Sequence, residues 1–265
     1  AKPTAVILPF FIVIFGSCFL RIQWREVLTR LWLWILLSIP FLLIAKWLQS
    51  DQKVQHLAPL WSRPIIALDS CLFYLYKTIL PIHLALDYGR TPSMILSRGA
   101  WNLLLWVMML TGCGFLFTQW KKRRWLVGGI TLFLLGFLPV SGIVAFQYQM
   151  FSTVADRYLY LSLVGLALAI AFGLMRVLER SSGKWFVGVS MVLVVFLGFL
   201  GFRQVTFWRN NISLFERALK ENPSSFLAHN NYAFYLYHDG RPQEAAVHLE
   251  QALRLAPDNS TLKAN

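Results

Sequence analysis

Long apolar stretches are the feature that most limits what this 265-residue chain can fold into. Stretches of about 18–20 apolar residues recur along the chain, and each is long enough to cross about 30 Å of hydrocarbon as a helix. Helices are expected because a helix satisfies its own backbone hydrogen bonds in lipid. The residues are 57% hydrophobic and 14% charged, whereas soluble domains are about 25% charged. The sequence therefore predicts an all-α membrane protein and excludes an ordinary soluble one.

Six apolar segments are predicted to span the bilayer, several of them with Trp at an end, where aromatic belts lie. They cover residues 3–20, 31–48, 101–119, 125–144, 159–178 and 185–202. The segment 64–86 is ambiguous, because it is apolar but interrupted by Asp69, Lys77 and Pro81. It either spans the bilayer or lies in the interface.

The basic residues favour the interfacial reading. Short connections rich in Lys and Arg join the spans at residues 21–30, 121–124 and 179–184. If 64–86 does not cross, all three lie on one side, which the positive-inside rule makes the cytoplasm. We therefore predict a re-entrant or interfacial segment. The repeats after residue 202 then face the periplasm or a lumen, and a bacterial inner membrane is favoured over the endoplasmic reticulum.

The net charge of +13 is carried largely by these loops. Anionic lipid headgroups are therefore the expected partner, and no nucleic acid is expected.

The sequence divides into two predicted domains: residues 1–202 form the membrane domain, and residues 203–265 form a linker and repeats. The chain begins at Ala1, directly before the apolar run Val6–Leu20, and it stops where a further repeat would start. We expect more sequence beyond both ends.

A period of 34 residues follows the last span. The pattern SLFERALKENP recurs as HLEQALRLAP, with Phe215 aligned to Leu249 and Pro223 to Pro257. This resembles the tetratricopeptide repeat, with a full unit of two antiparallel helices at 226–259 and a half unit before it. The family's packing positions fall on small side chains, on a turn glycine and on a closing proline. These residues are Ala233, Ala245, Ala252, Gly240 and Pro257.

The repeat has two readings: a stable stack, or a concave surface that binds segments of a protein partner. Partner binding is the favoured reading. His229 stands where the family has a bulky aromatic residue, and His229, His238 and His248 are interpreted as surface residues rather than metal ligands. The cysteines are interpreted as packing residues, so no metal site is predicted, and the need for a divalent metal stays open.

Three passages in the membrane domain carry a second resemblance: AKPTAVILPF, RPIIALDSCLFYLYKTILPIHLALDYGRTP and FSTVADRYLYLSLVGL. In this order, and followed by repeats, they look like the second half of the transmembrane-and-tetratricopeptide-repeat O-mannosyltransferase-like family, in a bacterial-type relative. The resemblance implies a glycosyltransferase of the C fold that takes a sugar from a polyprenyl-phosphate donor. The family's catalytic carboxylates lie upstream, so they match no position here.

The lipid phosphate would then be held at the outer mouth of a span, in VADRYLYL. Asp156, Arg157 and Tyr158 lie there, and the planar fork of an arginine suits a phosphate. The alternative is that Asp156 and Arg157 only pair with each other at the interface.

The motif DYGR in the outer loop offers Tyr88 and Arg90, with Gly89 allowing a tight turn toward the same phosphate. An ordinary polar turn is the alternative. Lys77 and Asp69 are costly in an apolar segment unless paired, which makes them candidates for a pocket lining.

The function predicted is thus the distal part of a polyprenyl-phosphate-sugar-dependent glycosyltransferase whose repeats bind a protein acceptor. One alternative is a non-enzymatic membrane scaffold that anchors the repeats in a larger complex. Another is an O-antigen ligase or polymerase, which would need a larger external loop than this chain has.

Overall fold

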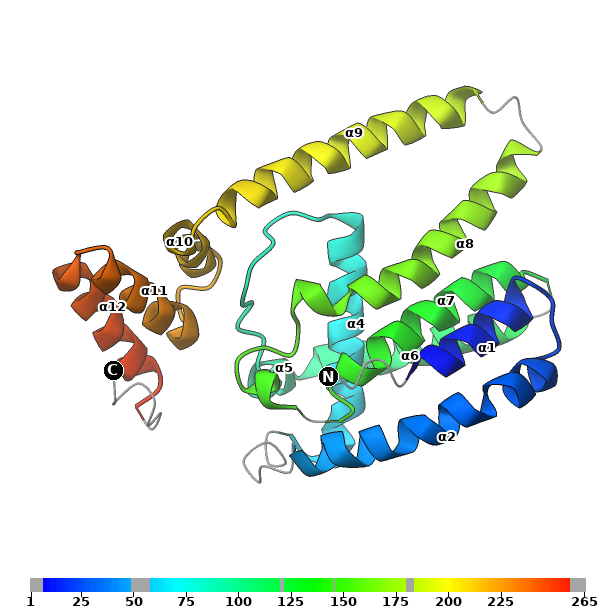
Figure 1. Ribbon diagram of the computed structural model, residues 1–265, viewed down its shortest axis with the longest axis horizontal. Coiled ribbons are helices and arrows are strands. Elements are labelled where there is room, and N and C mark those ends of the chain that lie inside the picture. The colour runs from blue at the N-terminus through cyan, green and yellow to red at the C-terminus, as the bar shows by residue number, and fades with distance from the viewer. Residues whose placement is uncertain (1–6, 49–57, 120–121, 145, 180–183, 258–265) are drawn as a thin grey trace.

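The computed structural model describes residues 7–48, 58–119, 122–144, 146–179 and 184–257. Within these ranges the chain forms helices, turns and loops and no β-strand. The predicted all-α fold class is therefore confirmed. Figure 1 shows a group of helices from α1 to α8, the long helix α9 as an arm beside them, and three short helices, α10 to α12, at its far end.

In the described residues, loops and four single turns of 3-10 helix lie between the α-helices. The α-helices are α1 (Leu8–Cys18), α2 (Trp24–Leu48), α4 (Arg63–Ile79), α5 (Pro92–Leu96), α6 (Ala100–Gln119), α7 (Arg124–Phe137), α8 (Tyr160–Leu178), α9 (Lys184–Phe207), α10 (Asn211–Glu221), α11 (Phe226–His238) and α12 (Pro242–Leu255). The 3-10 turns are η2 (Leu60–Ser62), η3 (Leu138–Val140), η4 (Gln147–Met150) and η5 (Asp156–Tyr158).

Two helices of the described residues are long and apolar enough to cross a membrane: Tyr160–Leu178 and Trp185–Phe207. The second of these buries none of its apolar window inside the protein, as a lipid-facing helix would. The other four predicted spans overlap α1, α2, α6 and α7, of which α1 and α7 are shorter than a membrane span. That all six segments cross the bilayer stays a prediction.

The ambiguous segment 64–86 divides into a helix and an irregular loop. Helix α4 ends at Ile79, and Pro81 follows where a continued helix would need a backbone N–H. In Figure 1, α4 runs at a steep angle to α7 and α8. The part of α4 that packs against the other helices includes buried polar side chains, among them Asp69 and Lys77.

Helices α7 and α8 form the most extensive helix pair, because glycines let their backbones approach. A Cβ atom built at Gly165 of α8 would meet the backbone of Phe133, and one at Gly136 of α7 would lie 2.7 Å from the amide nitrogen of Ser162. This close packing holds the first turns of α8 against α7. The residues just before α8 are thereby brought next to α4.

An aromatic core joins α4, α7 and the segment that enters α8. It contains Cys71, Tyr74, Phe133, Phe137, Val140, Val154 and Leu159. Tyr74 is fully buried, its hydroxyl accepts from the amide of Ala155 at 2.8 Å, and it donates to the carbonyl of the same residue at 3.1 Å. This two-way bond anchors the chain directly before Asp156.

The repeat forms a helical hairpin from α11 and α12, with α10 packed on α11. Ala233, Ala245 and Ala252 are all buried, which allows the helices to pack closely. Gly240 has φ of +79°, so it reverses the chain after α11 in the left-handed region that favours glycine. Pro257 follows the end of α12.

Candidate functional site

A loop of residues 80–91, here called the strap, connects α4 with α5 and carries the motif DYGR. Lys77, in the last turn of α4, shapes its start. The Lys77 ammonium donates to the backbone carbonyls of Ile82 at 2.7 Å and His83 at 2.9 Å. It lies 5.1 Å from the ring centroid of Tyr88 and 5.6 Å from that of Phe73. Lys77 is only 7% exposed, so these contacts replace its water.

Tyr88 connects the strap to the segment before α8. Its hydroxyl donates to a carboxylate oxygen of Asp156 at 2.8 Å and accepts from the amide of Ala85 at 3.1 Å. Burial raises the pKa of Asp156, while the hydrogen bond from Tyr88 and the charges of Lys77 and Arg157 oppose that rise. Burial also raises the pKa of Tyr88, so its phenol stays protonated and remains a donor.

Arg157 is exposed and lies on two aromatic rings. Its guanidinium carbon is 4.5 Å from the ring centroid of Tyr148 and 5.0 Å from that of Tyr158. No carboxylate in the described part of the chain forms a salt bridge with it. Asp156, its neighbour in sequence, instead bonds to Tyr88. The arrangement is a flat, exposed cation that forms a long hydrogen bond of 3.5 Å to the Tyr158 hydroxyl and no salt bridge, so its charge is available to an anionic ligand.

Arg90 has a different environment. Its guanidinium donates to Asp69 of α4 at 2.5 Å, and Arg98 donates to the other oxygen of the same carboxylate at 3.2 Å. The Asp69 side chain is only 8% exposed. The backbone of Arg90 does lie beside the segment before α8, because its carbonyl accepts from the amide of Thr153 at 2.8 Å. The strap is thus tied to that segment while the Arg90 charge is paired with Asp69.

The residues singled out from the sequence thus separate into two groups. Lys77, Tyr88 and Asp156 gather around the strap, whereas the Arg157 guanidinium lies against the rings of Tyr148 and Tyr158. Arg90 belongs to neither group, because it is paired with Asp69. Tyr148 and Tyr74 were not singled out for the site, and nothing in QYQM marks Tyr148 as an aromatic platform for a cation.

The described residues contain no group of three or more His, Cys, Asp or Glu side chains arranged to hold a metal ion. His229 and His248 are nevertheless partners rather than isolated surface residues, since their Nδ1 atoms lie 2.9 Å apart. Sequence reasoning missed this pair because the two residues come from different helices.

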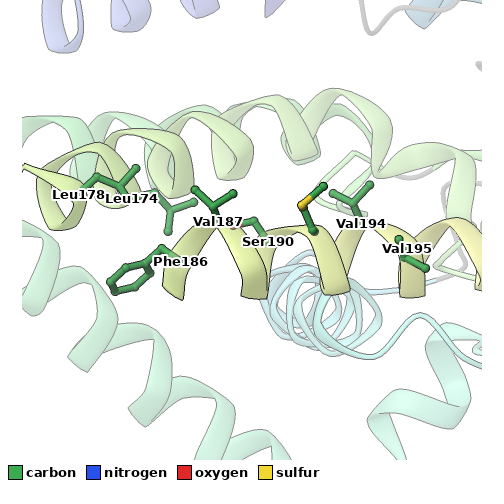
Figure 2. Close-up of a pocket in the computed structure, with 8 residues that line it drawn as sticks. Leu174, Leu178, Phe186, Val187, Ser190, Val194 and Val195 are labelled. Atoms are coloured by element: carbon green, nitrogen blue, oxygen red, sulfur yellow. The ribbon is translucent and has the colours of Figure 1, made fainter. Parts of the chain in front are cut away.

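Two apolar grooves lie along α9. Figure 2 shows the first, about 360 Å³, which lies between the end of α8 and the start of α9; its lining is Leu174, Leu178, Phe186, Val187, Ser190, Met191, Val194 and Val195. The second, about 330 Å³, lies between Pro81 and Leu84 of the strap and the last turns of α9. Their linings carry no ionisable side chain, so they offer apolar surface but no acid–base chemistry.

The fold and the site together define a class of protein: apolar helices able to cross a membrane, joined to a tetratricopeptide hairpin. The family model described as Tetratricopeptide repeat matches residues 226–259. The 34-residue period predicted this repeat, and it is present.

The chain is also similar to curated protein O-mannosyl-transferases. It is 25% identical over 205 residues to the protein O-mannosyl-transferase TMTC1 of Mus musculus, an alignment that covers 73% of this chain and 21% of the relative. TMTC1 of Homo sapiens is equally similar, with 23% of its length covered. Tmtc3 of Drosophila melanogaster is 28% identical over 129 residues, which are 48% of this chain and 14% of the relative.

The chain therefore spans about a fifth of the length of the TMTC1 relatives that it matches. No solved structure matches it significantly.

Proposed function

We propose that this chain is the distal part of a membrane glycosyltransferase that takes a sugar from a polyprenyl-phosphate donor. The similarity to protein O-mannosyl-transferases over 205 residues carries the proposal, because it includes most of the membrane domain. Within the chain, the exposed Arg157 supports a role in binding the donor.

Arg157 is proposed as the ligand of the lipid phosphate. A guanidinium can bind two phosphate oxygens with parallel hydrogen bonds, and the rings of Tyr148 and Tyr158 hold the guanidinium in one orientation. It lies three residues before Tyr160, the first residue of α8, which is one of the two described helices with the length and composition of a membrane span. The phosphate of a lipid carrier would sit at that depth.

Arg90 and Lys77 take a supporting role in this proposal. The Arg90 charge is already paired with Asp69, and the Lys77 ammonium donates to two backbone carbonyls. Both therefore hold the strap and Tyr88 in place, and Tyr88 in turn holds Asp156. Asp156 then positions Arg157 through the backbone, since the two residues are adjacent in η5.

The proposed reaction is a displacement at the anomeric carbon of the sugar. The bond from an acceptor oxygen to that carbon forms while the bond to the phosphate oxygen breaks, and the polyprenyl phosphate leaves with the electron pair. The acceptor hydroxyl loses its proton to a carboxylate base, which we expect outside this chain. Arg157 would stabilise the charge on the leaving phosphate.

The repeats are proposed to bind the protein acceptor or a partner, on the periplasmic or lumenal side of the membrane. The exposed aromatic side chains of Phe234 and Tyr237 on α11 support such a surface. The basic loops support this side for the repeats. The location proposed is a bacterial inner membrane rather than the endoplasmic reticulum.

Transfer from a radiolabelled polyprenyl-phosphate sugar to protein, measured with the full-length protein in membranes, tests the donor site. Arg157→Ala should lower transfer by on the order of a hundredfold, the loss expected for a charge-assisted contact of about 3 kcal/mol. Arg157→Lys should lose less, since it keeps the charge but not the fork. The control is Arg209→Ala, which removes an exposed arginine after α9. Equal activity of Arg157→Ala and Arg209→Ala would contradict the assignment.

The second candidate is a non-enzymatic membrane scaffold, which the exposed aromatic surface of α11 also fits. A scaffold would transfer no sugar from any donor, and its repeats would recover a stable complex from membranes. The same transfer measurement therefore separates the two functions.

A further inference from the structure

The repeat is docked on the strap through one buried carboxylate. Asp87 is 3% exposed, and one of its oxygens accepts from the Ser225 hydroxyl at 2.6 Å and from the Asn222 amide at 3.2 Å. The other oxygen accepts from the amide of Gly89 at 2.8 Å, which closes the turn of the strap. A single side chain thus holds the strap in shape and binds the repeat.

Ser225 is the N-cap of α11, and this gives the contact a specific physical basis. Its hydroxyl oxygen accepts from the amide of Ala228 at 3.1 Å while the hydroxyl hydrogen points to Asp87. The carboxylate therefore lies at the positive end of α11, where a negative charge is favourable. Ser225 is itself 3% exposed, so water does not compete for this bond.

Other contacts surround this bond on both sides. His83 of the strap lies 3.2 Å from Glu221 of α10, and the rings of Phe151 and Phe226 are 5.3 Å apart. Gly89 has φ of +61°, and a Cβ atom there would lie 2.7 Å from the Asn222 amide nitrogen. The docked arrangement therefore requires glycine both for the backbone and for the space.

Tyr88, which follows Asp87 in the strap, connects this contact to the candidate site through its hydrogen bond to Asp156. We propose that Asp87 is a positioning residue that fixes the tetratricopeptide hairpin relative to the Tyr88–Asp156 pair, so that a protein held by the repeat is presented beside Arg157. The presentation step rests on the proposed function. The coupling between the repeat and the Tyr88–Asp156 pair does not depend on the proposed function, and it can be measured without any sugar transfer.

Hydrogen–deuterium exchange on the full-length protein in lipid nanodiscs measures the coupling. Asp87→Ala should speed amide exchange on the order of tenfold in α10 and α11, since their docking contact is lost. It should also speed exchange at Tyr158 and Leu159, whose amides bond to Ala155 and Asp156. Unchanged exchange in these two segments, or a change confined to the repeat, would overturn the proposal.

Glycine variants provide a second test that is independent of the carboxylate. Gly89→Ala should produce the same two changes, because its methyl group meets Asn222. Gly99→Ala is the matched control: Gly99 also has a positive φ, of +55°, but nothing lies within 4 Å of its Cβ position. Equal effects of the two substitutions would mean that backbone strain alone is responsible, and would overturn the proposal.

A rescue variant separates positioning from general damage. Adding Asn222→Ala to Gly89→Ala makes room for the methyl group while keeping the Ser225 bond to Asp87. Exchange should therefore slow part of the way toward wild type, since only the strain of the positive φ remains. Where the wild type transfers sugar, transfer to protein should fall in Gly89→Ala and recover in the double variant. A wild type without transfer would refute the proposed function and leave the exchange results to decide the role of Asp87.

Discussion

The phenol of Tyr88 donates a 2.8 Å hydrogen bond to Asp156, although 68 residues separate the two in sequence. The bond joins the strap to the short segment that carries Arg157 into α8. It also satisfies a carboxylate that burial would otherwise leave without a donor. The geometry of the candidate site thus depends on a contact between two loops.

Tyr88→Phe removes only the hydroxyl, and we expect a loss of about 1–3 kcal/mol in the free energy of unfolding. Burial raises the pKa of Asp156 in the folded protein. Below the ordinary pKa the carboxyl is neutral, so burying it costs no charge. The cost of burying the charge appears as the pH rises through the folded-state pKa and the carboxylate forms. The loss should therefore be smaller near pH 4 than near pH 7, as measured by denaturant unfolding in detergent. Tyr76→Phe is the control, since Tyr76 is 49% exposed. Equal losses in the two variants would contradict a role for the hydrogen bond.

The two arginines bound to Asp69 should differ in importance. Arg90→Ala leaves a carboxylate that is 8% exposed without its closer partner and should cost about 3–5 kcal/mol. Arg98 is 33% exposed and its contact is longer, at 3.2 Å, so Arg98→Ala should cost about 1 kcal/mol or less. Thermal unfolding of both variants gives the comparison. A larger loss for Arg98→Ala would mean that Arg90 is free for another ligand.

The glycine contacts between α7 and α8 predict a strong dependence on position. Gly165→Ala places a methyl group against the backbone of Phe133 and should cost about 1–3 kcal/mol or more, because neither backbone can move far. Gly188→Ala in α9 meets nothing within 4 Å and should cost nothing. Resistance to unfolding in detergent distinguishes them. A tolerated Gly165→Ala would show that the two helices pack less closely.

The histidine pair of the repeat should make the hairpin sensitive to acid. The Nδ1 atoms of His229 and His248 lie 2.9 Å apart, so at least one ring must be neutral. Burial, and then the charge of His229, lower the pKa of His248, whereas the charge of Glu244 opposes this. Tyr232 also packs on the His248 ring. Because the folded-state pKa is lowered, the stability is present above the ordinary value of 6.5 and is lost as the pH falls below it.

The His229→Phe variant restores the aromatic residue usual in the repeat family and should remove most of this acid sensitivity. Exchange of the α11 and α12 amides in the full-length protein, followed between about pH 5 and pH 8, measures it. His238→Phe is the control, because His238 is exposed and lies outside the pair. An unchanged pH profile in His229→Phe would refute the role of the pair.

Much of the architecture could be read from the sequence, because it depends on local patterns. The length of the apolar runs indicates helices able to cross a bilayer, and the spacing of Phe215 and Leu249 indicates the repeat. The order of three short passages indicates the relatives. Each of these signals is present in consecutive residues or in a fixed period, so no knowledge of the packing is needed.

Only the tertiary structure decided which charges are paired. The sequence grouped Arg90 with Arg157, yet Arg90 bonds to Asp69, and Arg157 lies instead on Tyr148 and Tyr158. It also left DYGR as either a turn toward the phosphate or an ordinary polar turn, whereas Asp87 of this motif binds Ser225 across 138 residues. The reason is that buried polar groups must find partners wherever the packing places them. Those partners come from distant segments, which no local pattern of residues specifies.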